Sequence, residues 1–455
     1  YEMYTGSIIE IDDLIKQNRL KIKDDDLLRA QPLKELIKNK YYLPLTYNSD
    51  KSMTRYIEVD FYFNLDSVDN VHVSADGEMS VLLLGEDELD DILYIAKYSK
   101  GFSDRIFIGF VLDKHELVEK IDEYRTLIHM LNDKVLLKSD EQLESEIGYR
   151  IENLIFEIRQ YLSPLENFSS KQLTWYSDGK EIGNIDSRFA LESFLSNWMN
   201  NRFSQTLEVR NEGFNKQRVS KVQRNAAISV LDKLMKSRLI EEIEIEGFGP
   251  DYLIYVSILK NNHLNPFELT NLDSTILQDM RESLLNYIET SDRGNLLTLM
   301  KILQKEPFGM RKPIVPILTV SLLKDYWHQL SFYANGLFVE EMNAELLYSI
   351  LEQEAGFYEF EFYKLDEQVR QTILKVNDIF FDNSFEEHPV QVFSKLRRWL
   401  RQLPRYTQIT SNQSSYLIDF KDIIRYSEID PMDAANRLSQ LNKQTGLAFS
   451  DVKEE

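Results

Sequence analysis

The sequence predicts an α+β protein, mostly helical, that is divided into several domains. With 455 residues, the chain exceeds what one hydrophobic core usually supports, and domains of ~100 to 200 residues are expected. Helical periodicity dominates, most clearly between residues 117 and 162. Strand patterns are fewer and gather near residues 56–112 and 332–339. Apolar residues make up 43% of the chain and are spread throughout, so we expect it to be folded nearly end to end.

The first 115 residues predict a small α/β arrangement behind a lid-like segment. Helical patterns fill most of residues 1–62, and an alternating strand, Tyr56–Phe63, closes that segment. A strand, a helix and a second strand follow, at Met79–Leu84, Asp87–Ser99 and Arg105–Leu112. This spacing is typical of a βαβ unit, because two parallel strands need a crossover of about a dozen residues.

Two heptad patterns come next and predict an antiparallel helical arm. Apolar residues alternate in steps of four and three at Leu117, Ile121, Tyr124, Ile128, Leu131 and Val135. A second series runs through Leu143, Ile147, Ile151, Leu154, Ile158 and Leu162. Ser139 and Gln142 are spaced as a capping box, which indicates a new helix start. We therefore expect two helices folded back on each other, a form that serves protein interaction more often than catalysis.

A helix followed by a hairpin is predicted within Pro307–Val339. Pro313 and Pro316 suit the first turn of a helix, which we place at about Ile314–Leu330. Asn335-Gly336 can supply the two positive-φ residues of a type I′ turn between two short strands. Helical patterns flank this stretch at Ser274–Thr290, Leu296–Leu303 and Asn343–Gln353. The layout is that of a winged helix, a fold that binds nucleic acid in many proteins and only joins domains in others.

The remaining segments complete six expected parts. Asp178-Gly179 predicts a hairpin within Lys171–Ile182, and the last ninety residues predict helices broken at Pro389, Pro404 and Pro431. The expected parts are a lid-like α+β segment (1–62), a small α/β unit (63–115), the helical arm (116–165), a hairpin plus basic helical domain (166–265), the winged-helix-like domain (266–365) and a helical C-terminal domain (366–455).

Composition favours a soluble protein of a reducing compartment. The chain holds no cysteine, which excludes disulfides and cysteine-ligated zinc, and no apolar run approaches the ~18 to 20 residues of a membrane span. The N-terminal residues lack a basic start and an apolar signal core. We expect a cytoplasmic protein without membrane contact. Because the first residue is Tyr1, we also expect the chain to continue a longer polypeptide.

The formal charge of −22 repels nucleic acid on average, so any such contact must use local basic clusters. Between residues 202 and 238, nine bases stand against three acids, and a second basic cluster surrounds Trp399. The candidate nucleic-acid-binding residues are Arg218, Lys221, Arg224, Arg397, Arg398 and Arg401. The first three step by three and would share a helix face. The alternative is a solvated face that balances acidic neighbours such as Glu241 and Glu242.

The sequence offers no catalytic or metal-binding residues of its own. A phosphate-wrapping loop of the form G-x-x-x-x-G-K-[ST] is absent, and so is a G-x-S-x-G elbow. The six histidines include no pair at the i, i+4 spacing that directs two imidazoles at one metal. Carboxylates are so abundant, at 75, that pairs at any spacing are expected by chance. We therefore predict no cofactor in this chain.

Several segments resemble the region that follows the ATPase module in the large P-loop ATPases of bacterial phage-defence islands, the BREX group that includes BrxC and PglY. The resembling stretches are Pro44–Phe61, Arg210–Leu259, Pro307–Val339 and Leu400–Thr410. The resemblance implies that this is a C-terminal portion, with ATP and Mg²⁺ bound by a module upstream of Tyr1. It implies no catalytic residue here, because no position matches one.

The leading hypothesis is a non-catalytic region of a defence ATPase that gives scaffold, partner and nucleic-acid contacts. Its partners would be other defence-system subunits or further copies of itself, together with DNA or RNA. One alternative is a free-standing winged-helix protein that binds nucleic acid with the salt dependence of phosphate contacts. Another is a metal-dependent nuclease hidden among the carboxylates, although no compact acidic-plus-lysine pattern appears.

Overall fold

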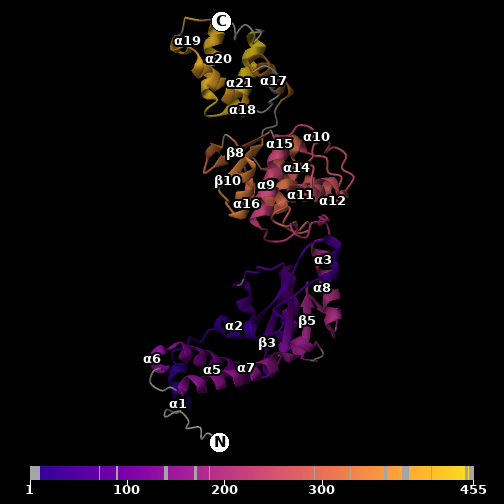
Figure 1. Cartoon of the computed structure of the whole chain (residues 1–455), viewed down its shortest axis with the longest axis vertical. Coiled ribbons are helices and arrows are strands. Elements are labelled where there is room, and N and C mark those ends of the chain that lie inside the picture. Colours follow the sequence, from indigo (N-terminus) through magenta and orange to yellow (C-terminus); the bar gives the residue numbers. More distant parts are fainter. Residues whose placement is uncertain are drawn as a thin grey trace. The chain divides into compact units, whose positions relative to one another are not determined.

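A computed structural model of the chain confirms the predicted class, α+β and mostly helical, with more than one domain (Figure 1). The chain divides into two compact units, Tyr1–Ser204 and Gln205–Glu455. The structure describes residues 11–70, 72–88, 91–137, 142–168, 172–183, 185–291, 293–327, 329–339, 341–362, 366–381, 389–410, 412–445 and 449.

A six-stranded mixed sheet organises the first unit. Its strands lie in chain order: β1 (Tyr41–Tyr42), β2 (Ile57–Tyr62), β3 (Gly77–Leu84), β4 (Arg105–Val111), β5 (Leu173–Ser177) and β6 (Lys180–Ile182). The central strands β2, β3 and β4 are parallel, whereas β1, β5 and β6 pair antiparallel. The expected βαβ unit is therefore present as β3, α4 (Asp91–Tyr98) and β4. The expected hairpin is also present, with Asp178 and Gly179 at φ values of 49° and 75°.

Helices cover both faces of this sheet. Successive residues of the strands direct apolar side chains to opposite faces, so both faces are apolar. One face packs against α2 (Asp26–Leu36), α5 (Lys114–Asn132), α7 (Leu143–Asn167) and α8 (Arg188–Arg202). The other face packs against α4 and a 3₁₀ turn at Leu65–Asn70. The short helix α3 (Leu45–Lys51) lies against α8. Burial on both faces explains why every residue of β3 is buried.

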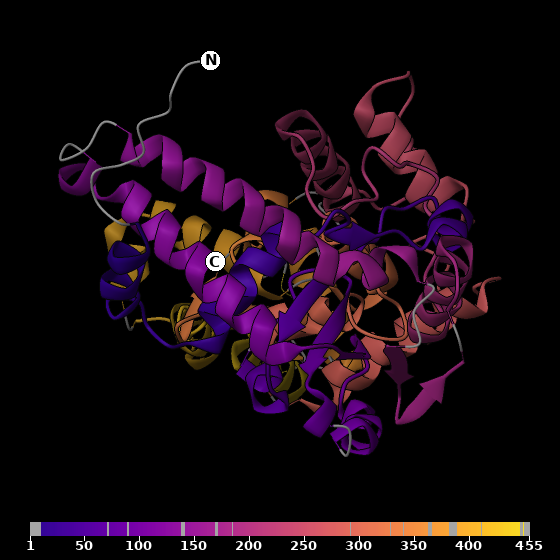
Figure 2. The ribbon, with the colours of Figure 1, turned by 90° about the horizontal axis from the view of Figure 1, so that it is seen from below.

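The predicted antiparallel arm is formed by α5 and α7, which lie side by side in Figure 2. Two ion pairs fix the antiparallel register: Lys120 with Glu157 at 2.7 Å, and Arg150 with Glu123 at 2.7 Å. All six predicted seam residues of α7 are buried. Helix α1 (Ile11–Arg19) packs its isoleucines into the same apolar cluster, so the first unit itself covers part of the seam.

The expected first heptad series is too long. Val135 is 82% exposed, because α5 ends at Asn132 and the short helix α6 (Lys134–Leu137) begins after it. The side chain of Asp133 accepts hydrogen bonds from the N–H groups of Val135 and Leu136, which caps the new helix and redirects the chain. Ser139 of the predicted capping box lies outside the described residues, and Gln142 directly precedes α7.

The largest core of the second unit contains the predicted winged-helix-like elements. Its helices are α9 (Lys221–Lys236), α10 (Ile240–Ile243), α11 (Pro250–Tyr255), α12 (Thr275–Thr290), α13 (Leu296–Ile302), α14 (Val315–Leu322), α15 (Lys324–Trp327) and α16 (Ala344–Glu352), with a π-helical turn at Val256–Lys260. Its antiparallel sheet has the order β7 (Gly294–Asn295), β10 (Tyr358–Phe362), β8 (Leu330–Ala334) and β9 (Leu337–Val339).

The predicted hairpin is confirmed, whereas the helix before it is shorter than expected. Asn335 and Gly336 take φ values of 50° and 79° between β8 and β9. The expected helix Ile314–Leu330 instead ends at Leu322 and is followed by α15. Leu330 belongs to β8 and lies opposite Phe362 of β10, so its backbone joins the sheet. Strand β10, which the sequence analysis did not predict, separates β7 from β8.

Five helices form the end of the described chain, and all of them except the short third helix contribute to an apolar cluster of their own. They are α17 (Glu367–Phe381), α18 (Pro389–Gln402), α19 (Arg405–Ile409), α20 (Ser415–Tyr426) and α21 (Pro431–Thr445). As expected, the prolines mark helix starts: Pro389 and Pro431 are first residues, and Pro404 precedes α19. Across the described residues, no helix has the length and apolar character needed to cross a membrane.

Candidate nucleic-acid interface

The first basic cluster centres on the start of α9, which a capping box fixes. The hydroxyl of Ser220 accepts from the backbone N–H of Gln223 at 3.3 Å, and the side chain of Gln223 accepts from the N–H of Ser220 at 3.3 Å. The helix therefore begins at Lys221. Arg218 lies before the cap, so the prediction that it shares a helical face with Lys221 and Arg224 is wrong. Only Lys221 and Arg224 are three residues apart on α9.

Arg224 binds the protein itself. Its guanidinium contacts Glu352 at 2.8 Å and Glu345 at 2.9 Å, both on α16, and lies 5.5 Å from the ring centre of Tyr348. The hydrogen bond that the Arg224 guanidinium donates to Glu345 is the main cause that raises the pKa of Arg224. Arg224 thus joins α9 to α16. For this residue, the structure favours the alternative that the base balances acidic neighbours.

Most other bases in the cluster have acidic or backbone partners nearby. Lys236 lies 2.7 Å from Asp232, and Arg210 lies 2.7 Å from Glu208. Lys233 donates to the backbone carbonyl of Glu244 at 3.3 Å. The contacts of Lys233 and Lys236 reduce the positive potential over the C-terminal half of α9.

Arg218 and Lys221 are different, because both are exposed and neither has a hydrogen-bond or ion-pair partner among the described residues. Lys221 is also the first residue of a sixteen-residue helix, where the free N–H groups add partial positive charge. The pair thus keeps its charge available to an external anion at one end of α9.

The second cluster lies on α18. Some of its arginines contact the protein itself, and others are exposed. The ring of Trp399 packs against that of Phe380, with 4.9 Å between their centroids, so Trp399 faces inward as expected. Arg397 donates to the carbonyl and hydroxyl oxygens of Ser427, at 2.8 and 3.0 Å, and so holds the end of α20. This internal role corrects the expectation that Arg397 faces outward with its neighbours.

Arg398 and Arg401 are exposed on the same helix. Arg401 approaches Glu428 at 3.5 Å, and both side chains are about two-thirds exposed, so the pair contributes little. Arg398 has no partner among the described residues. Of the six candidates, Arg218, Lys221 and Arg398 therefore stay unpaired within the described part of the chain, and Arg401 is only weakly paired.

The structure also bears on metal chemistry. In the described ranges, no three or more histidine, aspartate or glutamate side chains gather in a way that could hold a metal ion. Comparison of the chain with models of known protein families, with curated proteins and with solved structures gives no match. The resemblance to phage-defence ATPases therefore stays a prediction.

Proposed function

We propose that this chain is a non-catalytic region of a phage-defence type P-loop ATPase and that it contacts nucleic acid through the exposed start of α9. The observation that supports the contact is the pair Arg218 and Lys221, two exposed cations without partners among the described residues, on a chain of net charge −22. Phosphate contacts depend on local positive potential. Within the first cluster, the surface formed by Arg218 and Lys221 is therefore the best candidate for binding nucleic acid.

The position of α9 favours this proposal. The same core contains the hairpin β8–β9 and the helices around it, an arrangement typical of nucleic-acid-binding domains. Fold alone does not determine function, so the proposal depends on the charges rather than on the hairpin. A free-standing winged-helix protein would use the same surface, and reading the gene upstream of Tyr1 for a P-loop separates the two.

The test is charge reversal of the exposed pair. The double variant Arg218→Glu/Lys221→Glu is compared with the parent for binding of labelled duplex DNA, single-stranded DNA and RNA, by fluorescence anisotropy over a range of salt concentrations. Each lost phosphate contact is expected to make the negative slope of log affinity against log salt shallower by about 0.9 on duplex DNA. The magnitude of the slope should therefore decrease by about two, with weaker binding at low salt.

A matched control separates local from overall charge. Lys260 and Lys305 are exposed residues of the second unit outside the basic clusters. Each reversal removes one positive and adds one negative charge, so either double variant moves the net charge from −22 by −4, to −26. Lys260→Glu/Lys305→Glu should bind like the parent. Equal binding by both double variants would contradict the proposal.

A further inference from the structure

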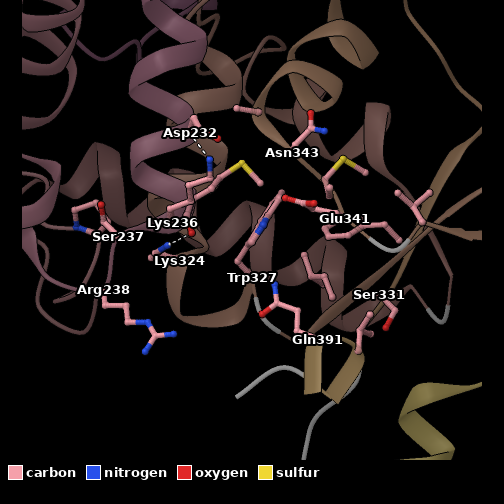
Figure 3. A pocket seen from close by; sticks show the side chains of 18 of the residues that line it. Asp232, Lys236, Ser237, Arg238, Lys324, Trp327, Ser331, Glu341, Asn343 and Gln391 are labelled. Atoms are coloured by element: carbon pink, nitrogen blue, oxygen red, sulfur yellow. Dashed lines mark hydrogen bonds and ion pairs between the residues drawn. The ribbon is translucent and has the colours of Figure 1, made fainter. Parts of the chain in front are cut away.

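A cavity of about 660 Å³ opens in the second unit, beside the C-terminal end of α9 (Figure 3). Its walls come from the end of α9, from residues 266–267, from α15, from the strands β8 and β9, from the start of α16 and from the first turn of α18. This volume is within the range of sites that bind small molecules. None of the candidate nucleic-acid-binding residues lines it.

The middle of the cavity is aromatic. Trp327 projects into the cavity, and its ring packs against Phe332 at 5.3 Å between centroids (Figure 3). Phe267, Phe338 and Met342 add further apolar wall. Flat apolar surfaces of this kind favour a ring that can stack or pack edge-on.

Lys324 and Arg238 line one side of the cavity, and a third cationic lining residue, Lys236, is paired with Asp232 (Figure 3). The ammonium of Lys324 donates to the carbonyls of Leu234 and Met235 at 2.6 and 2.9 Å, where α9 ends. Burial, and then the charge of Arg238, lower the pKa of Lys324 to about 8, while Glu242 opposes this shift. The two cations thus repel each other, and an anion between them would relieve that repulsion.

Two of the acids that line the cavity already have cationic partners. Asp325 accepts from Arg281 at 2.6 and 3.0 Å, and Asp232 accepts from Lys236 at 2.7 Å. The exposed Glu341 remains at the far side from Arg238 (Figure 3). In addition, the cavity offers one buried hydroxyl, that of Ser331, without a hydrogen-bond partner among the described residues.

We infer that this cavity binds a small aromatic anion, with a carboxylate or phosphate group between Lys324 and Arg238 and a ring against Trp327. This inference goes beyond the proposed nucleic-acid contact and uses different residues. Failure of one test therefore leaves the other standing.

The test is calorimetric titration of the whole chain with three probes that share one ring: 1-naphthyl phosphate, 1-naphthoate and neutral 1-naphthol. Both anions should bind at one site per chain, and more tightly than 1-naphthol. The tighter anion identifies the preferred group. Lys324→Met should weaken both anions about tenfold and leave 1-naphthol unchanged, as expected for the loss of one charge-assisted contact. Trp327→Ala should weaken all three.

Lys305→Met is the matched control, because it removes the charge of an exposed lysine that does not line the cavity. It should bind all three probes like the parent. The inference is overturned if no probe saturates, or if Lys324→Met and Lys305→Met behave alike. Should Lys324→Met fail to fold by circular dichroism, Arg238→Gln at an exposed position replaces it, with the same expected loss for the two anions and the same overturning result.

Discussion

Glu78 and Arg105 form an ion pair inside the first unit, and removing either charge alone is expected to destabilise that unit strongly. One oxygen of Glu78 accepts from Arg105 at 3.0 Å, from Tyr62 at 2.8 Å and from Ser80 at 2.6 Å. Glu78 and Arg105 are only 2% and 3% exposed, so water cannot replace a lost partner. The perturbation is a double-mutant cycle of Glu78→Met and Arg105→Met.

The magnitude follows from what each variant leaves behind. Either single variant leaves a buried charge without its partner, which costs about 3–5 kcal/mol. The double variant removes both charges and replaces both residues with apolar side chains. It still loses the acceptor of Tyr62 and Ser80, each worth about 1–3 kcal/mol. We expect the double variant to be more stable than the sum of the single effects predicts, by about 2–4 kcal/mol.

The assay must report the first unit alone. In a background with Trp327→Phe and Trp399→Phe, the remaining tryptophans are Trp175 and Trp198, which both lie in the core of the first unit. Denaturant unfolding followed by their fluorescence then gives the unfolding free energy of that unit. Single effects that add within about 0.5 kcal/mol would refute the reasoning, because independent sites behave that way.

The same pair predicts a pH dependence. Burial raises the pKa of Glu78 above its ordinary value of 4.5, against the opposing effect of Ser80 and Arg105. A carboxyl whose pKa is raised by folding binds its proton more tightly when folded. Its contribution to stability is therefore complete below pH 4.5 and is lost as the pH rises through the folded-state pKa. Compared with Glu78→Gln, which does not titrate, the parent should lose unfolding free energy above pH 4.5.

Two further predictions concern the arm and the hairpin. Ile151→Asp places a charge in the buried α7 seam and should lower the unfolding free energy of the first unit by several kcal/mol, about the cost of a buried unpaired ion. The control Phe156→Asp changes a residue of the same helix that is 65% exposed, and it should be nearly neutral. Denaturant unfolding measures both effects. Gly336→Ala should destabilise the second unit by about 1 kcal/mol, since φ is +79° there, and Gly356→Ala, which meets no neighbour and lacks positive φ, should change the melting temperature little. Equal effects within either pair would contradict the placement of these residues.

Local chemistry explains which elements the sequence predicts correctly. The turn at Asn335-Gly336, the βαβ spacing and the α7 seam each depend on residues close together in the chain. Backbone dihedral preferences and the periodicity of apolar residues determine such local structure. Strand β10 also carries a local signal that was not used to predict it, the alternation in YEFEF at 358–362. Its position between β7 and β8 depends on pairing across distant segments.

The candidate interface shows the same division. The sequence by itself determined where the bases cluster, because charge is a property of each side chain. Only the tertiary structure decided that Arg224 binds α16 and that Arg397 binds Ser427, since these partners lie 30 to 128 residues away along the chain. A positive charge remains available to a ligand only when folding brings no acceptor to it, and that depends on the packing of whole helices.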